Sequence, residues 1–260
     1  MVGVLAIFAV VAAMTAGGLY WVGMTRLRHG NPARISALFV GNSFTSANDL
    51  PKTVSLIAGS LGNHLDYDMS APGGYFLMQH ASDTQTLDKI RSKPWDFVVL
   101  QDQSQAPAQT DAYTDVYVLP YAAQLNDLIH KAHAGTKTVF FETWGYKNGD
   151  AGDCARDKNI CDYAGMQKRL DQTYYKMAQA ADGKVAPVGD AWSIIKQGYP
   201  AIDLYQNDGK HPSPEGTYLA ACVFYTTLFG KNVIGASHLT IDPQHAKILQ
   251  EVAQEIATNK

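Results

Sequence analysis

The sequence predicts an α/β protein in which a central five-stranded parallel sheet lies between two layers of helices, a three-layer arrangement of the flavodoxin type. From residue 34 onward, short apolar segments alternate with longer amphipathic ones, which is the order of a parallel α/β sheet. In addition, Val139-Phe140-Phe141 form an uninterrupted apolar run. Such a run is expected of a strand that helices cover on both faces.

The individual elements follow from this alternation. The apolar segments predict strands at residues 35–40, 65–70, 97–100, 138–143 and 185–188. The amphipathic segments between them predict helices at residues 49–61, 75–91, 116–134 and 163–180. Ser213 is a suitable N-cap and Pro214 suits the first position of a further helix, where Glu215 favours the positive end of the helix dipole. A last helix over residues 243–258 is expected to pack on the outside.

Composition narrows the class of protein. The 260 residues are 46% hydrophobic and 17% charged, as in a folded globular protein with a substantial core. The formal net charge of −3 gives no reason to expect nucleic acid as a partner. Neither GxxxxGK[ST] nor GxGxxG occurs in the sequence, so the usual signals for binding nucleotides are missing.

Two short motifs carry the chemistry. Gly41-Asn42-Ser43 directly follows the first predicted strand, where a turn can present a serine hydroxyl at the C-terminal edge of the sheet. Much later, Asp208 precedes His211 by three residues, just before a predicted helix. A histidine can take the proton of a serine hydroxyl as it attacks, and an aspartate can orient the histidine. The motifs therefore predict nucleophilic catalysis by Ser43, His211 and Asp208.

Together these motifs resemble the SGNH (GDSL-like) serine hydrolases over most of residues 35–230. That family has a Gly-Asx-Ser turn after its first strand and an Asp-x-x-His block near its end. It also has a glycine after the second strand, matched here by Gly73-Gly74, and usually an asparagine after the third. Gln103 occupies the position of that asparagine, which is a departure from the family. The resemblance implies an oxyanion hole formed by the N–H groups of Ser43 and Gly74 and by the Gln103 amide.

Other residues near these motifs are given less weight. Asp102 is a weaker candidate for the acid than Asp208 because its spacing is worse. The segment Thr143-Trp144-Gly145-Tyr146 follows the fourth strand and is expected either to line a substrate pocket or to be packed as aromatic core. Four further histidines on or near predicted helices are expected at the surface or half-buried: His64, His80, His130 and His133.

We therefore expect a serine esterase that hydrolyses carboxylic esters through an acyl-enzyme, without a metal or an organic cofactor. Its substrate is expected to be a small-molecule or glycan ester, with acetyl groups on carbohydrate as the specific hypothesis. Two alternatives stay open. One is an O-acyltransferase with the same triad, and the other is a non-catalytic binding module tethered to a membrane.

Residues 2–24 carry no charge and are rich in apolar residues. As a helix they would span roughly 34 Å, enough to cross a bilayer. We expect residues 1–29 to form a membrane anchor ahead of a catalytic domain over residues 30–260. A cleaved signal segment is the main alternative, and a mis-assigned start or a buried helix is another.

The sequence contains conflicting signals about the side of the membrane on which the catalytic domain lies. Arg26, Arg28 and Arg34 follow the apolar segment, which favours a cytoplasmic domain. Cys154 and Cys161 lie on a polar loop and are either disulfide-bonded, which requires an oxidising compartment, or unpaired thiols. Their spacing does not suit a zinc site. We expect a periplasmic or extracellular domain.

Overall fold

The structure, a computed structural model, describes residues 14–15, 18–19 and 31–258. The chain divides into two units, Met1–Asn31 and Pro32–Lys260. In the first, β1 (Met14–Thr15) pairs with β2 (Gly18–Leu19) in antiparallel fashion. The rest of the expected membrane segment, residues 2–24, lies outside the described residues. Within the described ranges, no helix is both long and apolar enough to cross a membrane.

The second unit contains the predicted five-stranded parallel sheet. Its strands are β3 (Arg34–Val40), β4 (His64–Ser70), β5 (Phe97–Leu100), β6 (Lys137–Glu142) and β7 (Lys184–Pro187). They are parallel and lie in the order β4-β3-β5-β6-β7. The strand order reverses between β3 and β5, and in open α/β sheets ligands bind outside the C-terminal ends of the strands at such a switch point.

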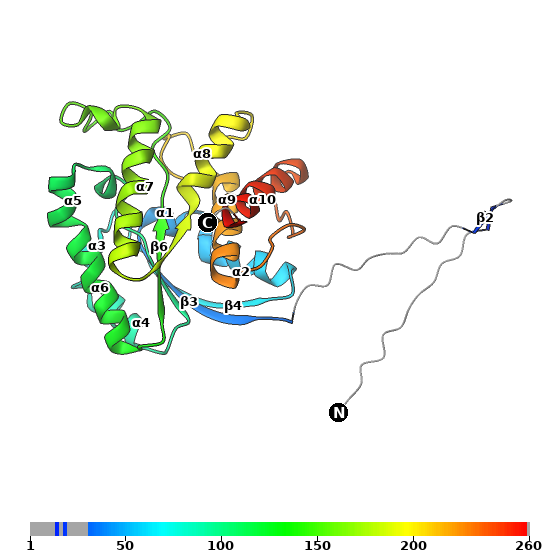
Figure 1. Ribbon diagram of the computed structural model, residues 1–260, viewed down its shortest axis with the longest axis horizontal. Coiled ribbons are helices and arrows are strands. Elements are labelled where there is room, and N and C mark those ends of the chain that lie inside the picture. The colour runs from blue at the N-terminus through cyan, green and yellow to red at the C-terminus, as the bar shows by residue number, and fades with distance from the viewer. Residues whose placement is uncertain (1–13, 16–17, 20–30, 259–260) are drawn as a thin grey trace. The chain divides into compact units, whose positions relative to one another are not determined.

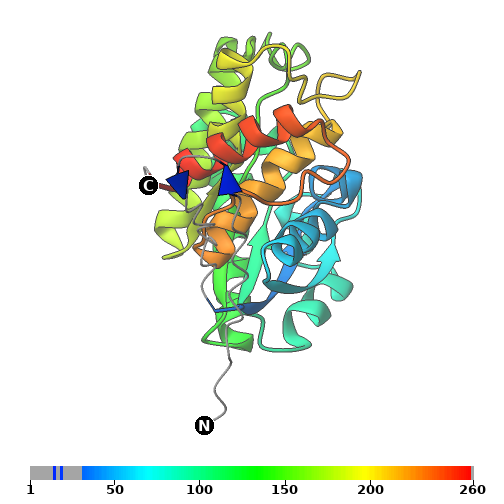
Figure 2. The ribbon, with the colours of Figure 1, turned by 90° about the vertical axis from the view of Figure 1, so that its right-hand side faces the viewer.

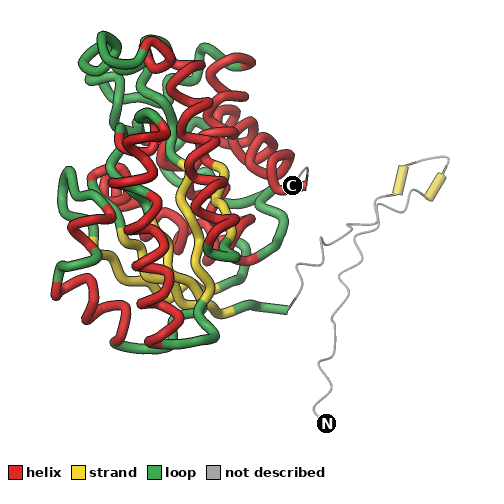
Figure 3. Tube along the Cα trace, turned by 60° about the vertical axis from the view of Figure 1, so that its left-hand side comes forward, coloured by secondary structure: helices red, strands yellow, loops and turns green. Residues whose placement is uncertain are grey.

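Helices cover both faces of this sheet, as predicted (Figure 1, Figure 3). One face carries α2 (Leu50–Ser60), α9 (Pro214–Phe229) and α10 (Pro243–Thr258). The other carries α4 (Thr84–Arg91), α6 (Leu119–Ala132) and α7 (Tyr163–Ala180). The helix α8 (Val188–Gly198) packs against α7, α9 and α10. This is the three-layer α/β/α fold.

The core lies where α9 packs on the sheet. Figure 2 shows α9 and α10 side by side, so α9 has neighbours on opposite sides and most of its residues are buried. Phe224 of α9 contacts Phe39 of β3 and Phe141 of β6 edge-on, with ring centroids 5.4 and 4.9 Å apart. These contacts fix α9, and with it the loop that precedes α9, against β3 and β6, the strands on either side of β5.

Several short helices complete the unit. They are α1 (Ser43–Ser46), η1 (Ala47–Asp49), α3 (Leu77–His80), η2 (Ala106–Ala108), α5 (Asp111–Tyr117) and η3 (Lys158–Ile160). The single helix predicted at 75–91 is wrong, because Asp83 caps a new helix by accepting from Thr86 N–H at 2.8 Å. The single helix predicted at 116–134 is also wrong, since α5 ends before Val118 and α6 begins at Leu119.

The segment after β7 differs from the prediction, whereas the start of α9 agrees with it. Val188, predicted as the end of a strand, begins α8, a helix that was not predicted. The start of α9 is as predicted: Ser213 Oγ accepts from Gly216 N–H at 3.0 Å, with Pro214 first in the helix. The loop carrying His211 therefore ends at a well-formed cap.

Candidate active site

Ser43 is the first residue of α1, immediately after β3. Asn42 caps this helix through Oδ1, which accepts from Phe44 N–H at 3.1 Å. Its Nδ2 donates to Tyr75 O at 2.9 Å and so ties the turn to the loop that follows β4. Asn42 therefore braces the turn that carries Ser43. Ser43 N–H is the first of α1, and the first N–H groups of a helix lack intrahelical partners, so it is a suitable donor for a bound oxyanion.

Gly41 allows a close approach that the turn requires. A Cβ at this position would lie 2.5 Å from Gln101 Oε1 and 2.4 Å from Thr45 Oγ1, so these side chains would have to shift to make room for it. The same Gln101 oxygen accepts from Asn42 N–H and from the Thr45 hydroxyl, both at 2.9 Å. Gln101 is fully buried. It therefore fixes the backbone directly before Ser43, a role that the sequence did not reveal.

The three residues predicted as a triad lie in one hydrogen-bonded chain. His211 Nε2 is 2.9 Å from Ser43 Oγ, although the two residues are 168 positions apart. On the other side of the ring, Nδ1 donates to Asp208 Oδ2 at 2.5 Å. A hydroxyl bonded to an imidazole whose other nitrogen is held by a carboxylate can lose its proton as it attacks an electrophile.

Asp208 is in the charged form that this chain requires. Burial opposes the charge, but hydrogen bonds from the His211 side chain and from two backbone N–H groups outweigh it and lower the pKa of Asp208 to about 2. The backbone donors are those of Lys210, at 2.9 Å, and His211, at 3.0 Å, both to Oδ1. Oδ2 is thereby left for the imidazole.

The loop carrying Asp208 and His211 is held from several sides. Trp144 donates from its indole N–H to Lys210 O at 2.9 Å, and Lys147 N–H donates to Gly209 O at 2.8 Å. Trp144 is buried and stacks on Phe44, with ring centroids 4.7 Å apart. Of the two alternatives for Trp144, the packed aromatic is the one observed. Its position nevertheless joins the residue after Ser43 to the residue before His211.

The two other expected oxyanion donors, Gly74 and Gln103, lie on separate loops, and the Asp102 carboxyl group is hydrogen-bonded to both loops. Gly74 has φ +74°, in the left-handed region that favours glycine. Asp102 Oδ1 accepts from Leu77 N–H, at the end of the Gly74 loop, and from Gln103 N–H, at 2.9 and 2.7 Å. The Gln103 side chain folds over its own loop, with Oε1 accepting from Gln105 N–H at 2.7 Å.

Asp102 is a structural connector and takes no part in the hydrogen-bonded chain through His211, as expected. It is completely buried, and this burial raises its pKa to about 7 against the opposing effect of the Leu77 and Gln103 N–H groups. Within the described residues, its Oδ2 has no hydrogen-bond partner. A protonated carboxyl at this position removes the cost of a buried charge.

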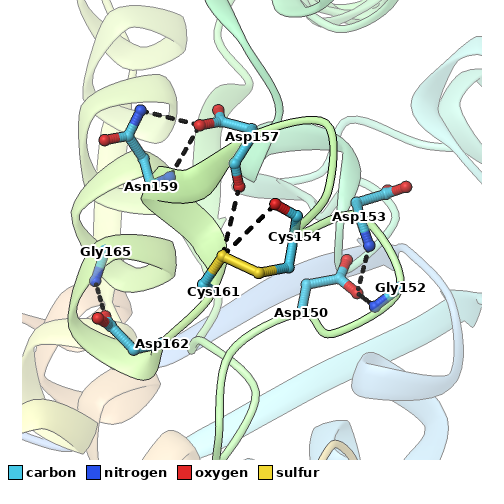
Figure 4. The surroundings of a disulfide bond; sticks show 9 residues. All are labelled: Asp150, Gly152, Asp153, Cys154, Asp157, Asn159, Cys161, Asp162 and Gly165. Carbon is cyan, nitrogen blue, oxygen red and sulfur yellow. Dashed lines mark hydrogen bonds between the residues drawn. A yellow bond between two sulfur atoms is a disulfide. The ribbon is translucent and has the colours of Figure 1, made fainter.

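A disulfide bond between Cys154 and Cys161 closes a loop (Figure 4) that is hydrogen-bonded to the segment after Gln103. Cys154 and Cys161 are bonded, which decides between the two alternatives for these residues. Asp150, buried at the base of this loop, accepts from Gln105 Nε2 at 2.5 Å. Asp153 accepts from Gln109 Nε2 at 2.9 Å. The closed loop therefore holds the segment that begins with Gln103.

Among the predicted histidines, His80 is a correction. It is fully buried. Its polar atoms have partners there, since Nε2 bonds to Gly41 O at 2.8 Å and Nδ1 lies 2.9 Å from the Thr86 hydroxyl. His64 is exposed, and His130 and His133 are half-buried, as predicted. No local pattern distinguishes His80 from these three, since its partners come from other elements.

One group of acidic side chains in the described part of the chain has the geometry to hold a metal ion. Glu142, Asp171 and Asp190 offer oxygens that all lie within 4.8 Å of one another. Burial and then the charge of Asp171 raise the pKa of Asp190 to about 6. Glu142 already accepts from Gln167 Nε2 at 2.9 Å. None of these residues belongs to the chain from Ser43 to Asp208, so this group adds nothing to the chemistry of Ser43.

Comparison with known proteins identifies solved structures with this fold. No protein-family model matches the chain, and no curated protein does. A protein of the family DUF4886 from Bacteroides uniformis is similar with a TM-score of 0.73 and 19% identity, over 86% of this chain and 95% of that one. A protein from Slackia heliotrinireducens, described as a candidate SGNH hydrolase, is 26% identical with a TM-score of 0.63, over 75% of this chain and 99% of that one.

An enzyme of known substrate shares the fold at greater distance. An acetylxylan esterase from Geobacillus stearothermophilus has a TM-score of 0.52 and 16% identity, over 76% of this chain and 95% of that one. At this level of identity the likeness is one of fold. The chain thus has the fold of structures described as SGNH or GDSL-like hydrolases, as the two motifs imply.

Proposed function

We propose that this chain, which has the fold of the SGNH hydrolases, is a serine esterase that cleaves carboxylic esters. The observation that carries the proposal is the hydrogen-bonded chain from Ser43 Oγ through His211 to Asp208. It lies at the C-terminal ends of the strands beside the switch point between β3 and β5.

In the proposed reaction, Ser43 Oγ attacks the ester carbonyl while His211 Nε2 takes the hydroxyl proton. The tetrahedral oxyanion accepts hydrogen bonds from the N–H groups of Ser43 and Gly74 and from the Gln103 amide. Its collapse forms the acyl-enzyme and expels the alcohol, which receives the proton from His211. Water then attacks the acyl group with His211 again as the base, releasing the acid and restoring Ser43.

Acetyl esters of carbohydrate are the proposed substrates. The support is the fold shared with the acetylxylan esterase together with a proposed location outside the cytoplasm. The Cys154–Cys161 disulfide favours that location, because such bonds persist in oxidising compartments. We further propose that residues 1–29 anchor the domain in the membrane.

The reaction is tested with a fluorophosphonate probe on residues 30–260, alongside Ser43→Ala and His211→Ala. We expect one adduct, on Ser43, formed by displacement of fluoride and absent in both variants. No adduct on folded wild-type protein would overturn the esterase and favour a binding module. An enzyme that reacts with the probe but releases the alcohol of an ester only when a sugar acceptor is present, with the acyl group recovered on the sugar, would be a transferase.

The substrate and the location have their own tests. We expect faster hydrolysis of acetylated xylan oligosaccharides than of long-chain acyl esters, measured as kcat/KM on each. The reverse order would contradict the acetyl-carbohydrate proposal. For location, fusions of the full chain to one reporter that folds only outside the cytoplasm and one that folds only inside distinguish the two orientations.

A further inference from the structure

The peptide group between Gly41 and Asn42 is held on both sides by buried side chains outside the proposed triad. On its amide side, Asn42 N–H donates to Gln101 Oε1 at 2.9 Å. On its carbonyl side, Gly41 O accepts from His80 Nε2 at 2.8 Å. Both His80 and Gln101 have no exposed surface. The chain turns from β3 into α1 at this peptide, so its orientation determines where Ser43 points.

The direction of the bond from His80 is fixed by chemistry. A carbonyl oxygen can only accept, so Nε2 must carry a hydrogen. This is true of the neutral ring with its hydrogen on Nε2 and also of the charged ring, so the contact to Gly41 survives a change in the charge of His80. Burial lowers the pKa of His80, while the bond to Gly41 and the charge of Asp83 oppose that effect.

The imidazole is itself held in place by its surroundings. Nδ1 lies 2.9 Å from the Thr86 hydroxyl, which is 2.7 Å from Asp83 Oδ2 and 2.9 Å from the hydroxyl of Ser70. Ser70 ends β4, and Asp83 and Thr86 begin α4. The ring of Tyr75 contacts the imidazole edge-on, with centroids 5.2 Å apart. Through these contacts His80 ties the turn before Ser43 to the end of β4 and the start of α4.

We propose that His80 is a positioning residue for Ser43, which it holds through the Gly41 carbonyl without touching the substrate. The inference rests on the proposed role of Ser43 as the nucleophile. If the donor is lost, Gly41 O loses its His80 partner while buried, which is costly. Only the bond from Asn42 N–H to Gln101 then holds the peptide group, and it can rotate away from its present orientation. A displaced Ser43 then loses its alignment with His211 and with the oxyanion donors.

Two substitutions separate the hydrogen bond from the bulk of the ring. His80→Gln places an amide nitrogen near the position of Nε2 and keeps a donor for Gly41 O. His80→Phe keeps an aromatic ring and removes the donor. His130→Phe is the matched control, because His130 also has a ring nitrogen bonded to a backbone carbonyl, that of Asn126 at 3.0 Å, but on α6.

We expect His80→Phe to lower kcat about 10- to 100-fold with little change in KM, since misalignment affects the transition state more than binding. His80→Gln is expected to retain kcat within about threefold, and His130→Phe to behave as wild type. A wild-type kcat in a folded His80→Phe variant, or an equal loss in His80→Gln, would overturn the inference.

Amide hydrogen exchange gives a readout that does not depend on activity. Exchange at residues 41–46 should be faster in His80→Phe and unchanged in His80→Gln. If His80→Phe fails to fold, His80→Asn, whose amide is too short to reach Gly41 O, replaces it with the same expected result. Unchanged exchange in the donor-free variant overturns the inference whatever the activity. Faster exchange in a protein that neither reacts with the fluorophosphonate nor cleaves esters would instead contradict the proposed function alone.

Discussion

Trp144 donates its indole N–H to the carbonyl oxygen of Lys210 at 2.9 Å, so a residue two positions after the end of β6 holds the peptide that immediately precedes His211. The other side of the same side chain stacks on Phe44, next to Ser43. A single buried aromatic residue thus sets the distance between the two ends of the proposed catalytic chain.

Trp144→Phe should therefore reduce activity as well as stability. The loss of the bond to Lys210 is expected to lower kcat about 10-fold and the free energy of unfolding by about 1–3 kcal/mol. Trp95→Phe is the control, since Trp95 is also buried and donates to a backbone carbonyl, Lys89 O at 2.9 Å, but lies ahead of β5. Steady-state kinetics and thermal unfolding are measured on both variants. An equal kcat in Trp144→Phe and Trp95→Phe would refute the role of Trp144.

Gly41→Ala tests the close approach of Gln101 to the turn between β3 and α1, which carries Ser43. The new methyl group would lie 2.5 Å from Gln101 Oε1, so Gln101 must shift and release Asn42 N–H. We expect a loss of about 1–3 kcal/mol in stability, together with a lower kcat. In Gly73→Ala the added methyl group meets nothing within 4 Å, and no such effect is expected. Full activity of Gly41→Ala would contradict this account.

The strands and the pairing of Asp208 with His211 were predictable because their signals are local. A buried parallel strand needs a continuous apolar run, and β5 (Phe97–Leu100) lies where that run predicts it. The helices α7 and α10 also have the predicted bounds. Asp208 and His211 are three residues apart, so their pairing could be predicted from spacing and confirmed by the 2.5 Å contact.

Features that depend on contacts between distant elements were not predictable. The periodicity of residues 75–91 continues through the break before α4, and the capping role of Asp83 is visible only once its bond to Thr86 is known. Likewise His80 is one of the four histidines expected at the surface or half-buried, and only its contact with Gly41, 39 residues away, distinguishes it.

The buried Asp102 predicts a dependence of stability on pH. Its pKa is about 7 in the folded protein against an ordinary 3.8, so between these values the unfolded chain loses a proton that the folded protein keeps. Stability from this group is therefore full below about pH 4, falls as the pH rises to 7 and then levels out.

Asp102→Asn should lack this dependence. We expect its free energy of unfolding, relative to wild type, to increase by up to about 4 kcal/mol between pH 4 and pH 7. Denaturant titrations across this range measure the difference. Asp88→Asn, which removes the same formal charge from an exposed position, controls for net charge. A constant difference between Asp102→Asn and wild type would show that Asp102 is ionised in the folded protein.

The disulfide should stabilise the loop that supports the Gln103 segment. Its cysteines are seven positions apart, and closing so short a loop is worth about 2.5 kcal/mol in the chain-entropy estimate. A reductant should lower the melting temperature of wild type but leave unchanged that of the Cys154→Ser, Cys161→Ser double variant, which begins lower. Equal melting temperatures of oxidised wild type and the double variant would contradict this.

Gln103 is the departure from the family pattern, and its two functional groups can be tested separately. Oε1 accepts from Gln105 N–H at 2.7 Å and from Ala106 N–H at 3.2 Å, which holds the start of η2. Among the residues that the structure describes, the hydrogen bonds of Nε2 are limited to contacts of 3.4 Å with Ser104 Oγ and Gln105 Oε1. These are too long to be strong hydrogen bonds. The amide can therefore turn its donor toward an oxyanion while its oxygen keeps the loop in place.

Gln103→Glu keeps an acceptor for both N–H groups and removes the donor, whereas Gln103→Ala removes both. If the amide binds the oxyanion, both variants should lose about 10²–10³-fold in kcat with little change in KM, and the Glu variant should lose at least as much because its charge repels the oxyanion. Gln109→Ala loses one of the bonds that hold this segment, that to Asp153, and should lower kcat far less than either Gln103 variant. A Glu variant as active as wild type would leave the oxyanion to the N–H groups of Ser43 and Gly74. Gln103 would then be a brace for its loop, like its neighbour Asp102.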